Sequence, residues 1–354
     1  MEKVRVLVVG CGNMGTSHAR AYHQLPDFEI VGLVSRNPAS REKLSKELGG
    51  LSTYDNFSHA LQETKPDAVS INTYPDTHAA YAKAALNAGA HVFLEKPLAT
   101  TAKEAHELID LAHSSGRQLV IGYILRVHPA WKEFVVSARN LGKPLVMRMN
   151  LNQQSSGPQW ETHKQLMQSM SPIVDCGVHY VDIMCSMTQS KPVSVFANGT
   201  RLSDEIAPDM YNYGQLQVKF EDGSIGWYEA GWGPMMSETA FFIKDVIGPR
   251  GSVSISDQPK GASDDISGHT QTGGLKIHHG LLNDSGEFIK QDEWIGIKDE
   301  PDHDELCLLE QELFSKAIRE QIDLSEHHQA AVDSLKIVLA ADESVRTGQV
   351  ISLS

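Results

Sequence analysis

The sequence has few of the features that mark several large classes of protein. It contains four cysteines in 354 residues, and no two of them form a C-x-x-C pair. Neither a zinc knuckle nor a disulfide framework is therefore expected, and a reducing cytoplasm is the simplest compartment. No apolar run approaches the roughly 20 residues that a membrane-spanning helix needs. The mostly apolar six-residue run at 4–9 is also too short for the core of a signal peptide.

Positive charge is scarce as well. The chain has 31 Lys and Arg against 45 Asp and Glu, which gives a formal net charge of −14. A nucleic-acid interface needs clustered basic side chains, and no run in this sequence is basic enough to supply one. We therefore expect neither a nucleic acid nor a membrane as partner, which leaves a small molecule as the expected ligand.

Strands and helices alternate through the first 125 residues. Apolar strands are expected at 4–9, 28–35, 68–72, 91–94 and 118–122, and helices at 14–24, 79–87 and 101–116. Apolar runs of this length are typical of strands that are buried on both faces. Their alternation with helices predicts an α/β fold with a doubly wound parallel sheet, so residues 1–125 are expected to form a Rossmann dinucleotide-binding domain.

The pattern changes beyond residue 126. One helix is expected at 129–141, followed by strands at 145–151, 193–197, 216–220, 225–230, 241–247 and 252–255, long excursions at 257–300 and a final helix at 328–347. A chain of this length exceeds one ordinary core. We therefore expect residues 126–354 to form a second α/β domain with a large, mostly antiparallel open sheet. It would serve substrate binding and oligomerisation, and its final helix could pack back toward the first domain.

A glycine-rich turn follows the first strand directly. Gly10, Gly12 and Gly15 form G-x-G-x-x-G between a strand and a helix that opens at Asn13 and Met14. In this setting the first glycine allows a tight turn, the second admits a pyrophosphate close to the backbone, and the third allows close packing of helix on strand. The N–H groups of the helix N-terminus attract an anion. The turn therefore predicts a dinucleotide site.

The end of the second strand bears on the choice of cofactor. An NAD site usually has an acid about twenty residues beyond the glycines, where it bonds the ribose hydroxyls. This chain has Ser35 and Arg36 there instead. A hydroxyl and a guanidinium suit a 2′-phosphate, so NADP is favoured over NAD. Two alternatives stay open, because Arg36 could stack on the adenine or point to solvent.

The run Val92–Pro97 ends a short apolar strand with Glu95, Lys96 and Pro97. The carboxyl end of a strand in an open parallel sheet faces the ligand crevice. A lysine at that place can polarise a carbonyl or stabilise a developing alkoxide. Lys96 is therefore a candidate catalytic residue.

An acid and an imidazole stand four residues apart in the second half of the chain. On a helix, Asp175 and His179 would share one face, with Asp182 close by. A carboxylate beside an imidazole orients it and stabilises its protonated form, so the pair could accept a proton from a hydroxyl. A buried polar pair, or a capping aspartate with an unrelated histidine, explains the spacing equally well.

A catalytic metal is not expected. The pairs at 278–279, 303–304 and 327–328 offer histidines, but adjacent side chains point in different directions and no H-E-x-x-H occurs.

Three of these features together resemble the Gfo/Idh/MocA family of glucose–fructose oxidoreductases and inositol dehydrogenases. They are the glycine turn, Glu95-Lys96-Pro97 and the Asp175–His179 spacing, and the likeness runs along nearly the whole chain. Further matching pieces are Thr73-Tyr74-Pro75 with His78, Gly122-Tyr123 with Arg126, and Val246-Ile247-Gly248 with Gly251. Two departures could reshape the pocket. Tyr74 stands where proline is common, and Met170-Ser171 stands where paired glycines often precede the aspartate.

The resemblance implies a Rossmann domain followed by an open-sheet domain, packed into homodimers or homotetramers. It implies that Lys96 lies beside the nicotinamide and the substrate, that His179 accepts the proton, and that Asp175 assists at the substrate hydroxyl. Further cofactor contacts are implied at Thr73, Tyr74, Pro75, His78 and Glu95.

Aromatic and polar side chains suit a polyhydroxylated ligand. The candidates for lining a substrate pocket are Tyr123, Arg126, Trp160, His163 and Trp232. For two of these an alternative stays open: Trp232 could be part of the core, and His163 a surface residue in a mobile loop.

The expected function is hydride transfer between a nicotinamide, NADP or NAD, and a secondary alcohol of a sugar, inositol or related polyol. One alternative is a redox-neutral, NAD-dependent glycoside hydrolase of the same fold. Another is a non-enzymatic dinucleotide sensor, although such a protein would be expected to lack Lys96, Asp175 or His179, and all three are present.

Overall fold

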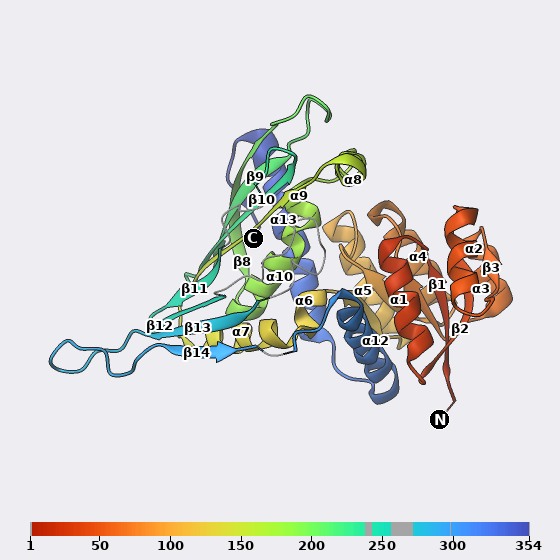
Figure 1. Cartoon of the computed structure of the whole chain (residues 1–354), viewed down its shortest axis with the longest axis horizontal. Helices are drawn as coiled ribbons and strands as arrows, with labels where there is room; N and C mark the ends of the chain where they lie inside the picture. Colours follow the sequence, from red (N-terminus) through yellow and green to blue (C-terminus); the bar gives the residue numbers. More distant parts are fainter. Residues whose placement is uncertain (1, 238–242, 256–271, 298, 354) are drawn as a thin grey trace. The chain divides into compact units, whose positions relative to one another are not determined.

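The computed structural model describes residues 2–237, 243–255, 272–297 and 299–353, which form two compact units (Figure 1). The first unit comprises the chain up to Ile124 together with His303–Val332, and the second comprises Leu125–Asp302 and Asp333–Ser354. No helix among the described residues is long and apolar enough to span a lipid bilayer.

The sheet of the first unit is parallel throughout. Its six strands are β1 (Val4–Val9), β2 (Phe28–Val34), β3 (Thr53–Tyr54), β4 (Ala68–Ile71), β5 (His91–Glu95) and β6 (Leu119–Gly122). They lie in the order β3-β2-β1-β4-β5-β6, and every neighbouring pair is parallel. The order reverses between β1 and β4, which places the expected ligand crevice at the carboxyl ends of these two strands.

Seven helices accompany this sheet in the sequence. They are α1 (Asn13–Gln24), α2 (Pro38–Glu47), α3 (Phe57–Thr64), α4 (Pro75–Asn87), α5 (Ala102–Ser115), α12 (His303–Glu320) and α13 (Ser325–Thr347), the last of which continues into the second unit. One of them begins well before its expected start. Helix α4 begins at Pro75 rather than at residue 79, because proline is favoured at a first helical position. Helices α2, α3 and α12 were not predicted from the sequence.

The placement of α12 corrects the expected domain boundaries. Residues 303–332 were assigned to the second domain, but they belong to the first unit. The reason is apolar packing: Phe314 is fully buried, and its ring lies 6.2 Å from that of Phe28 and 6.0 Å from that of Phe93. These three rings belong to the same hydrophobic core as the side chains of strand β1. Helix α12, from near the C-terminal end of the sequence, therefore completes the core of the first unit.

The second unit has a nine-stranded sheet. Its strands are β7 (Val146–Gln154), β8 (Pro192–Thr200), β9 (Tyr213–Phe220), β10 (Ile225–Gly233), β11 (Lys244–Gly248), β12 (Gly251–Ile255), β13 (Gly274–His279), β14 (Glu293–Gly296) and β15 (Ile351–Ser352). The order is β14-β13-β12-β11-β7-β10-β9-β8-β15, and only the β7–β10 pair is parallel among the described strands. A strand was expected at 241–247; residues 241–242 lie outside the described part, and the described strand begins at Lys244.

Four helices pack against this sheet: α7 (Pro129–Asn140), α8 (Gly157–Leu166), α9 (Pro172–Asp175) and α10 (Gly177–Thr188). The short helix α6 (Ile124–Val127) precedes α7. Helix α10 packs against β7 and β10, where Gly177 allows the close approach: a Cβ there would lie 2.9 Å from a ring carbon of Tyr228. The ring of Tyr180 stacks on Tyr228 at 5.2 Å. This contact fixes the start of α10, the helix that carries His179.

Candidate functional site

The glycine turn leaves space only where a ligand is expected. Gly10 has φ +95°, and a Cβ on it would lie 2.3 Å from the carbonyl oxygen of Asn72. A Cβ on Gly15 would lie 1.9 Å from the carbonyl oxygen of Gly10. A Cβ on Gly12, by contrast, would meet nothing within 4 Å. Helix α1 begins without a side-chain cap, so its first N–H groups are available to an anion.

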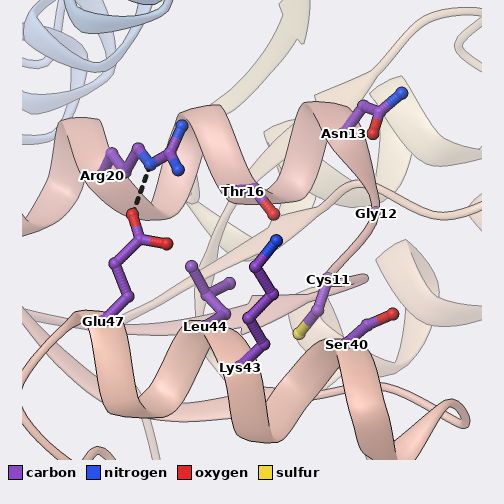
Figure 2. Close-up of a pocket in the computed structure, with 9 residues that line it drawn as sticks. All are labelled: Cys11, Gly12, Asn13, Thr16, Arg20, Ser40, Lys43, Leu44 and Glu47. Carbon is purple, nitrogen blue, oxygen red and sulfur yellow. Dashed lines mark hydrogen bonds and ion pairs between the residues drawn. The ribbon is translucent and has the colours of Figure 1, made fainter.

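A polar pocket of about 210 Å³ adjoins this turn (Figure 2). It is lined from α1 and its preceding turn by Cys11, Gly12, Asn13, Thr16 and Arg20, and from α2 by Ser40, Lys43, Leu44 and Glu47. Arg20 donates to Glu47 across the pocket at 2.6 Å, and this bond lowers the pKa of Glu47. Lys43 reaches from α2 toward Thr16, which brings a cation beside the glycine turn (Figure 2).

Cys11, Thr16 and Arg20 were not predicted as site residues, and neither were the four lining residues on α2: Ser40, Lys43, Leu44 and Glu47. The signal that could have located the residues on α2 is the start of this helix, where Asn37 caps the helix and Pro38 takes its first position. Asn37 accepts from the backbone N–H of Ala39 at 3.0 Å.

Ser35 and Arg36 lie at the carboxyl end of β2, as expected. The Ser35 hydroxyl accepts weakly from the backbone N–H of Asn37 at 3.3 Å, and its carbonyl accepts from Arg41 at 2.8 Å. The side chain of Arg36 is exposed. Two groups able to bind an anion, Ser35 and Arg36, thus lie in the connection between β2 and α2, and a third, Lys43, lies on α2 itself.

The loop after β4 is braced by His78. Its ring is fully buried and lies 2.8 Å from the carbonyl oxygen of Pro97 and 2.9 Å from that of Thr73. Burial lowers the pKa of His78, although both carbonyls oppose this effect. Tyr74 is half exposed and Pro75 opens α4. His78 therefore joins the loops that end β4 and β5.

Glu95 and Lys96 occupy the carboxyl end of β5. The Glu95 side chain is buried, with Oε1 at 2.7 Å from Nε2 of His18, and Oε2 accepts from the backbone N–H of Lys96 at 3.2 Å. Lys96 is half-buried. Gly122 lies opposite Glu95 in β6, where a Cβ would come within 3.3 Å of Oε1. The turn is therefore held in place from its buried side.

Asp175 and His179 do not share one continuous helix, contrary to the expectation. Asp175 is the last residue of α9, and His179 is the third residue of α10. Ser171 caps α9 by accepting from Val174 at 3.2 Å, and α10 restarts at Gly177. The sequence contains both signals, a serine–proline helix start and a glycine, but each is weak alone.

Arg126 pairs with Asp182 in the second unit. The guanidinium donates to both carboxylate oxygens, at 2.6 and 2.5 Å. Burial raises the pKa of Asp182, and Arg126 opposes this effect. We take the pair as ionised at neutral pH, because both oxygens accept from a group that stays charged. Arg126 is thus oriented by its partner.

Three of the substrate candidates gather in the second unit. The His163 ring stacks on Trp232 at 4.5 Å and 9°, and Trp160 belongs to the same apolar cluster as Trp232 and Cys176. The Trp232 indole donates to Gln153 at 2.7 Å. His163 is buried on α8, so its expected alternative as a mobile surface residue is wrong.

Tyr123 belongs to the first unit. It is buried, and its ring lies 6.2 Å from that of His327. Gln153 was missed from the sequence because a single glutamine within a strand carries no local signal; it is found only through its contacts with Trp232 and Cys176.

A parallel sheet with a topological switch point, a glycine turn and an uncapped helix N-terminus define a dinucleotide-binding protein of the Rossmann class. Residues 4–123 match the family described as "Oxidoreductase family, NAD-binding Rossmann fold", and residues 134–254 match the "GFO/IDH/MocA C-terminal domain". The chain therefore belongs to the Gfo/Idh/MocA family of oxidoreductases.

Its relatives include dehydrogenases of sugars and inositols. It is 26% identical over 270 residues to D-glucoside 3-dehydrogenase of Escherichia coli (strain K12), covering 71% of this chain and 77% of the relative. It is 26% identical over 292 residues to scyllo-inositol 2-dehydrogenase (NAD(+)) of Bacillus subtilis (strain 168), covering 77% and 82%. The fold matches GenD2 from gentamicin A biosynthesis in complex with NAD, with TM-score 0.79 and 20% identity over 100% and 97% of the two chains.

Proposed function

We propose that this protein is an NAD(P)-dependent dehydrogenase or reductase that acts on a secondary alcohol of a sugar, inositol or related polyol. One observation carries the proposal: Lys96 stands at the carboxyl end of β5, in the same sheet as the glycine turn that ends β1. That edge of a Rossmann sheet is where a nicotinamide and its substrate bind. The named activities of the two curated relatives support this substrate class.

Each candidate residue has a distinct role in the proposal. The bound nicotinamide supplies the hydride chemistry. Lys96 donates a hydrogen bond to the substrate oxygen and offsets the negative charge that grows there during oxidation. His179 accepts the hydroxyl proton as the hydride leaves the same carbon, which leaves a ketone. Asp175 orients the substrate hydroxyl.

Trp160, His163 and Trp232 are 5%, 6% and 1% exposed, and the His163 ring stacks on Trp232. Trp232 is thus part of the core, which was the alternative left open, and the cluster is proposed to shape the wall of the sugar-binding pocket and not to offer an open stacking face. Arg126, oriented by Asp182, would offer hydrogen bonds to hydroxyl groups.

The preferred cofactor is proposed to be NADP. Ser35 and Arg36 replace the usual acid, and Lys43 adds a cation to the pocket beside the glycine turn. We expect Arg36→Asp to weaken NADPH binding about tenfold to a hundredfold, because a hydrogen bond to a charged group contributes roughly 1.5–3 kcal/mol.

Fluorescence titration with NADPH and NADH would measure this effect. The matched control is Lys46→Asp, which makes the same charge change at the other end of α2. Arg36→Asp should lose NADPH affinity while NADH affinity stays within about threefold. Equal loss with the control would contradict the assignment, and so would a wild-type protein that prefers NADH.

Oligomerisation through the sheet of the second unit is also proposed. Ile225 and Ile247 are exposed and flank Val146 in register across β10, β7 and β11. Apolar side chains aligned on an exposed sheet face are typical of a surface that pairs. The compartment is proposed to be a reducing cytoplasm, in keeping with four buried cysteines that form no disulfide.

Replacement of Lys96 or His179 tests the proposed chemistry. We expect Lys96→Ala and His179→Ala to lower kcat about a hundredfold or more, since general acid–base groups typically contribute that much. Cofactor affinity should change far less. Steady-state turnover on inositols and hexoses, with NADPH titration of each variant, gives both values. Normal turnover by Lys96→Ala would end the assignment.

A further inference from the structure

Helix α12 brings a buried polar group against the Glu95–Lys96 turn inside the first unit. His18 of α1, Glu95 of β5 and Gln311 of α12 are at most 6% exposed. Cys307 and Glu310 of α12 lie beside them and are also buried. Burying so many polar side chains is costly unless they bond one another, so their contacts need an explanation.

The contacts form one chain from α12 to Lys96. The Nε2 amide of Gln311 lies 2.9 Å from Nδ1 of His18, and Nε2 of His18 lies 2.7 Å from Oε1 of Glu95. Oε2 of Glu95 accepts from the backbone N–H of Lys96 at 3.2 Å. Four residues from three separate segments are thus joined by successive hydrogen bonds.

The tautomer of His18 follows from the orientation of the Gln311 amide, whose nitrogen faces the ring and whose Oε1 is buried without a hydrogen-bond partner among the described residues. An amide NH₂ group only donates, so Nδ1 of His18 must accept. The ring proton of the neutral imidazole is then on Nε2, from which it is donated to the Glu95 carboxylate. Gln311 therefore sets the direction of the hydrogen bond that Glu95 receives.

Apolar packing keeps both side chains in place. The Phe93 ring meets the edge of His18 at 4.8 Å. Gly122 packs closely against both side chains. A Cβ at this position would lie only 3.1 Å from the Phe93 ring and 3.3 Å from the Glu95 carboxylate. The carboxylate therefore has one position, with one oxygen toward His18 and the other toward the Lys96 backbone.

A metal site is the competing explanation for this cluster, because candidate ligand atoms of His18, Cys307 and Glu310 lie within 4.8 Å of one another. Both ring nitrogens of His18, however, already have protein partners. A metal would have to displace Gln311 or Glu95, so the geometry favours an orienting role.

We propose that His18 and Gln311 are positioning residues for Lys96. They hold the Glu95 carboxylate, and that carboxylate holds the backbone of the turn from which the Lys96 side chain projects. The inference rests on the proposed function of Lys96. It gives α12 a role besides packing, because this helix supplies the group that sets the His18 tautomer.

Replacement of Gln311 by methionine is the first test. The two side chains have similar length, but methionine cannot donate to His18. We expect kcat to fall about tenfold to a hundredfold, in line with the cost of a small misplacement of a reacting group. KM and NADPH affinity should stay within about threefold. The matched control is Glu310→Gln, a buried neighbour on the same helix that lies outside the chain of hydrogen bonds.

Two substitutions of His18 separate orientation from packing. In His18→Gln an amide N–H can still reach Glu95, so kcat should stay within about fivefold of wild type. In His18→Leu that donor is lost, and kcat should fall as far as in Gln311→Met. An equal loss of kcat in His18→Gln and His18→Leu would overturn the proposal.

Nitrogen NMR of the ¹⁵N-histidine-labelled protein reads the tautomer directly, with His18→Gln used to identify the signal. Wild-type His18 should be neutral with its proton on Nε2, and Gln311→Met should change the Nδ1 shift while the melting temperature of the protein stays close to wild type. A proton on Nδ1 in the wild type would overturn the proposal. So would unchanged kcat in Gln311→Met.

The two proposals can fail separately. If Lys96→Ala keeps full turnover, the proposed function fails, whatever the tautomer of His18. If Lys96→Ala is inactive but Gln311→Met and His18→Leu turn over normally, only the positioning role fails.

Discussion

At the scale of single residues, Glu310 is the most unusual side chain of the first unit. Both of its carboxylate oxygens are buried without a hydrogen-bond partner among the described residues. Burial, and secondly the charge of Glu95, raise the pKa of Glu310 well above its ordinary value. Its other titratable neighbours are His18 and Cys307, with Tyr22 of α1 also coupled to it. Glu310 is therefore expected to be protonated and neutral at pH 7.

This protonation has a consequence for stability. The folded state keeps the Glu310 proton after the unfolded chain has lost it, so the free energy of unfolding should fall as pH rises above the ordinary value of 4.5. Glutamine does not titrate, so Glu310→Gln should not show this loss of stability as pH rises. We expect the variant to match wild type near pH 4 and to exceed its melting temperature increasingly toward pH 8. Thermal unfolding from pH 4 to pH 8 measures the difference in melting temperature between variant and wild type. A difference that does not change with pH would contradict the prediction.

The residues of the glycine turn and of Glu95-Lys96-Pro97 could be placed from the sequence, because short motifs between strong strands fix their own local geometry. The partners His18 and Gln311 could not be. They lie 293 positions apart, and no local pattern joins them. The Asp175–His179 spacing misled for a related reason, since a helix break depends on how Gly177 packs against Tyr228.

At the scale of elements, the buried strands of the first sheet were predicted well because continuous apolar runs identify them. Helix α2 was missed because its ten residues include only two that are buried, Leu44 and Ser45, and so show little apolar periodicity. Helix α12 packs into a hydrophobic core whose other residues lie far from it in the sequence. The contacts of Phe314 place this helix in the first unit, and no local sequence pattern reveals those contacts.

Substitution of this ring tests the assignment of α12. Phe314 is fully buried between Phe28 and Phe93. We expect Phe314→Ala to lower the free energy of unfolding by about 3–5 kcal/mol, the usual cost of removing a buried phenyl ring. Hydrogen exchange should show the loss of protection in β1, β2 and β5 rather than in β7 and β10. Loss confined to the nine-stranded sheet would contradict the assignment.

At the scale of the whole molecule, the sequence allowed the order of a parallel and then a mostly antiparallel sheet to be predicted, because the two strand patterns differ. It did not reveal that the chain returns to the first unit at His303 and leaves it again within α13. The chain therefore passes between the two units three times, at 124/125, 302/303 and 332/333. The proposed enzyme needs both units, since Lys96 and His179 belong to different ones.

Hydride transfer is the central claim, and isotope transfer tests it most directly. The wild-type protein would be incubated with NADP or NAD and with inositols or hexoses carrying deuterium at each secondary alcohol carbon in turn. We predict that one deuterium passes from a single carbon to C4 of the nicotinamide, seen by mass spectrometry of the reduced cofactor, and that Lys96→Ala abolishes the transfer. Release of a sugar product with no deuterium in the cofactor, or transfer that survives Lys96→Ala unchanged, would contradict the account.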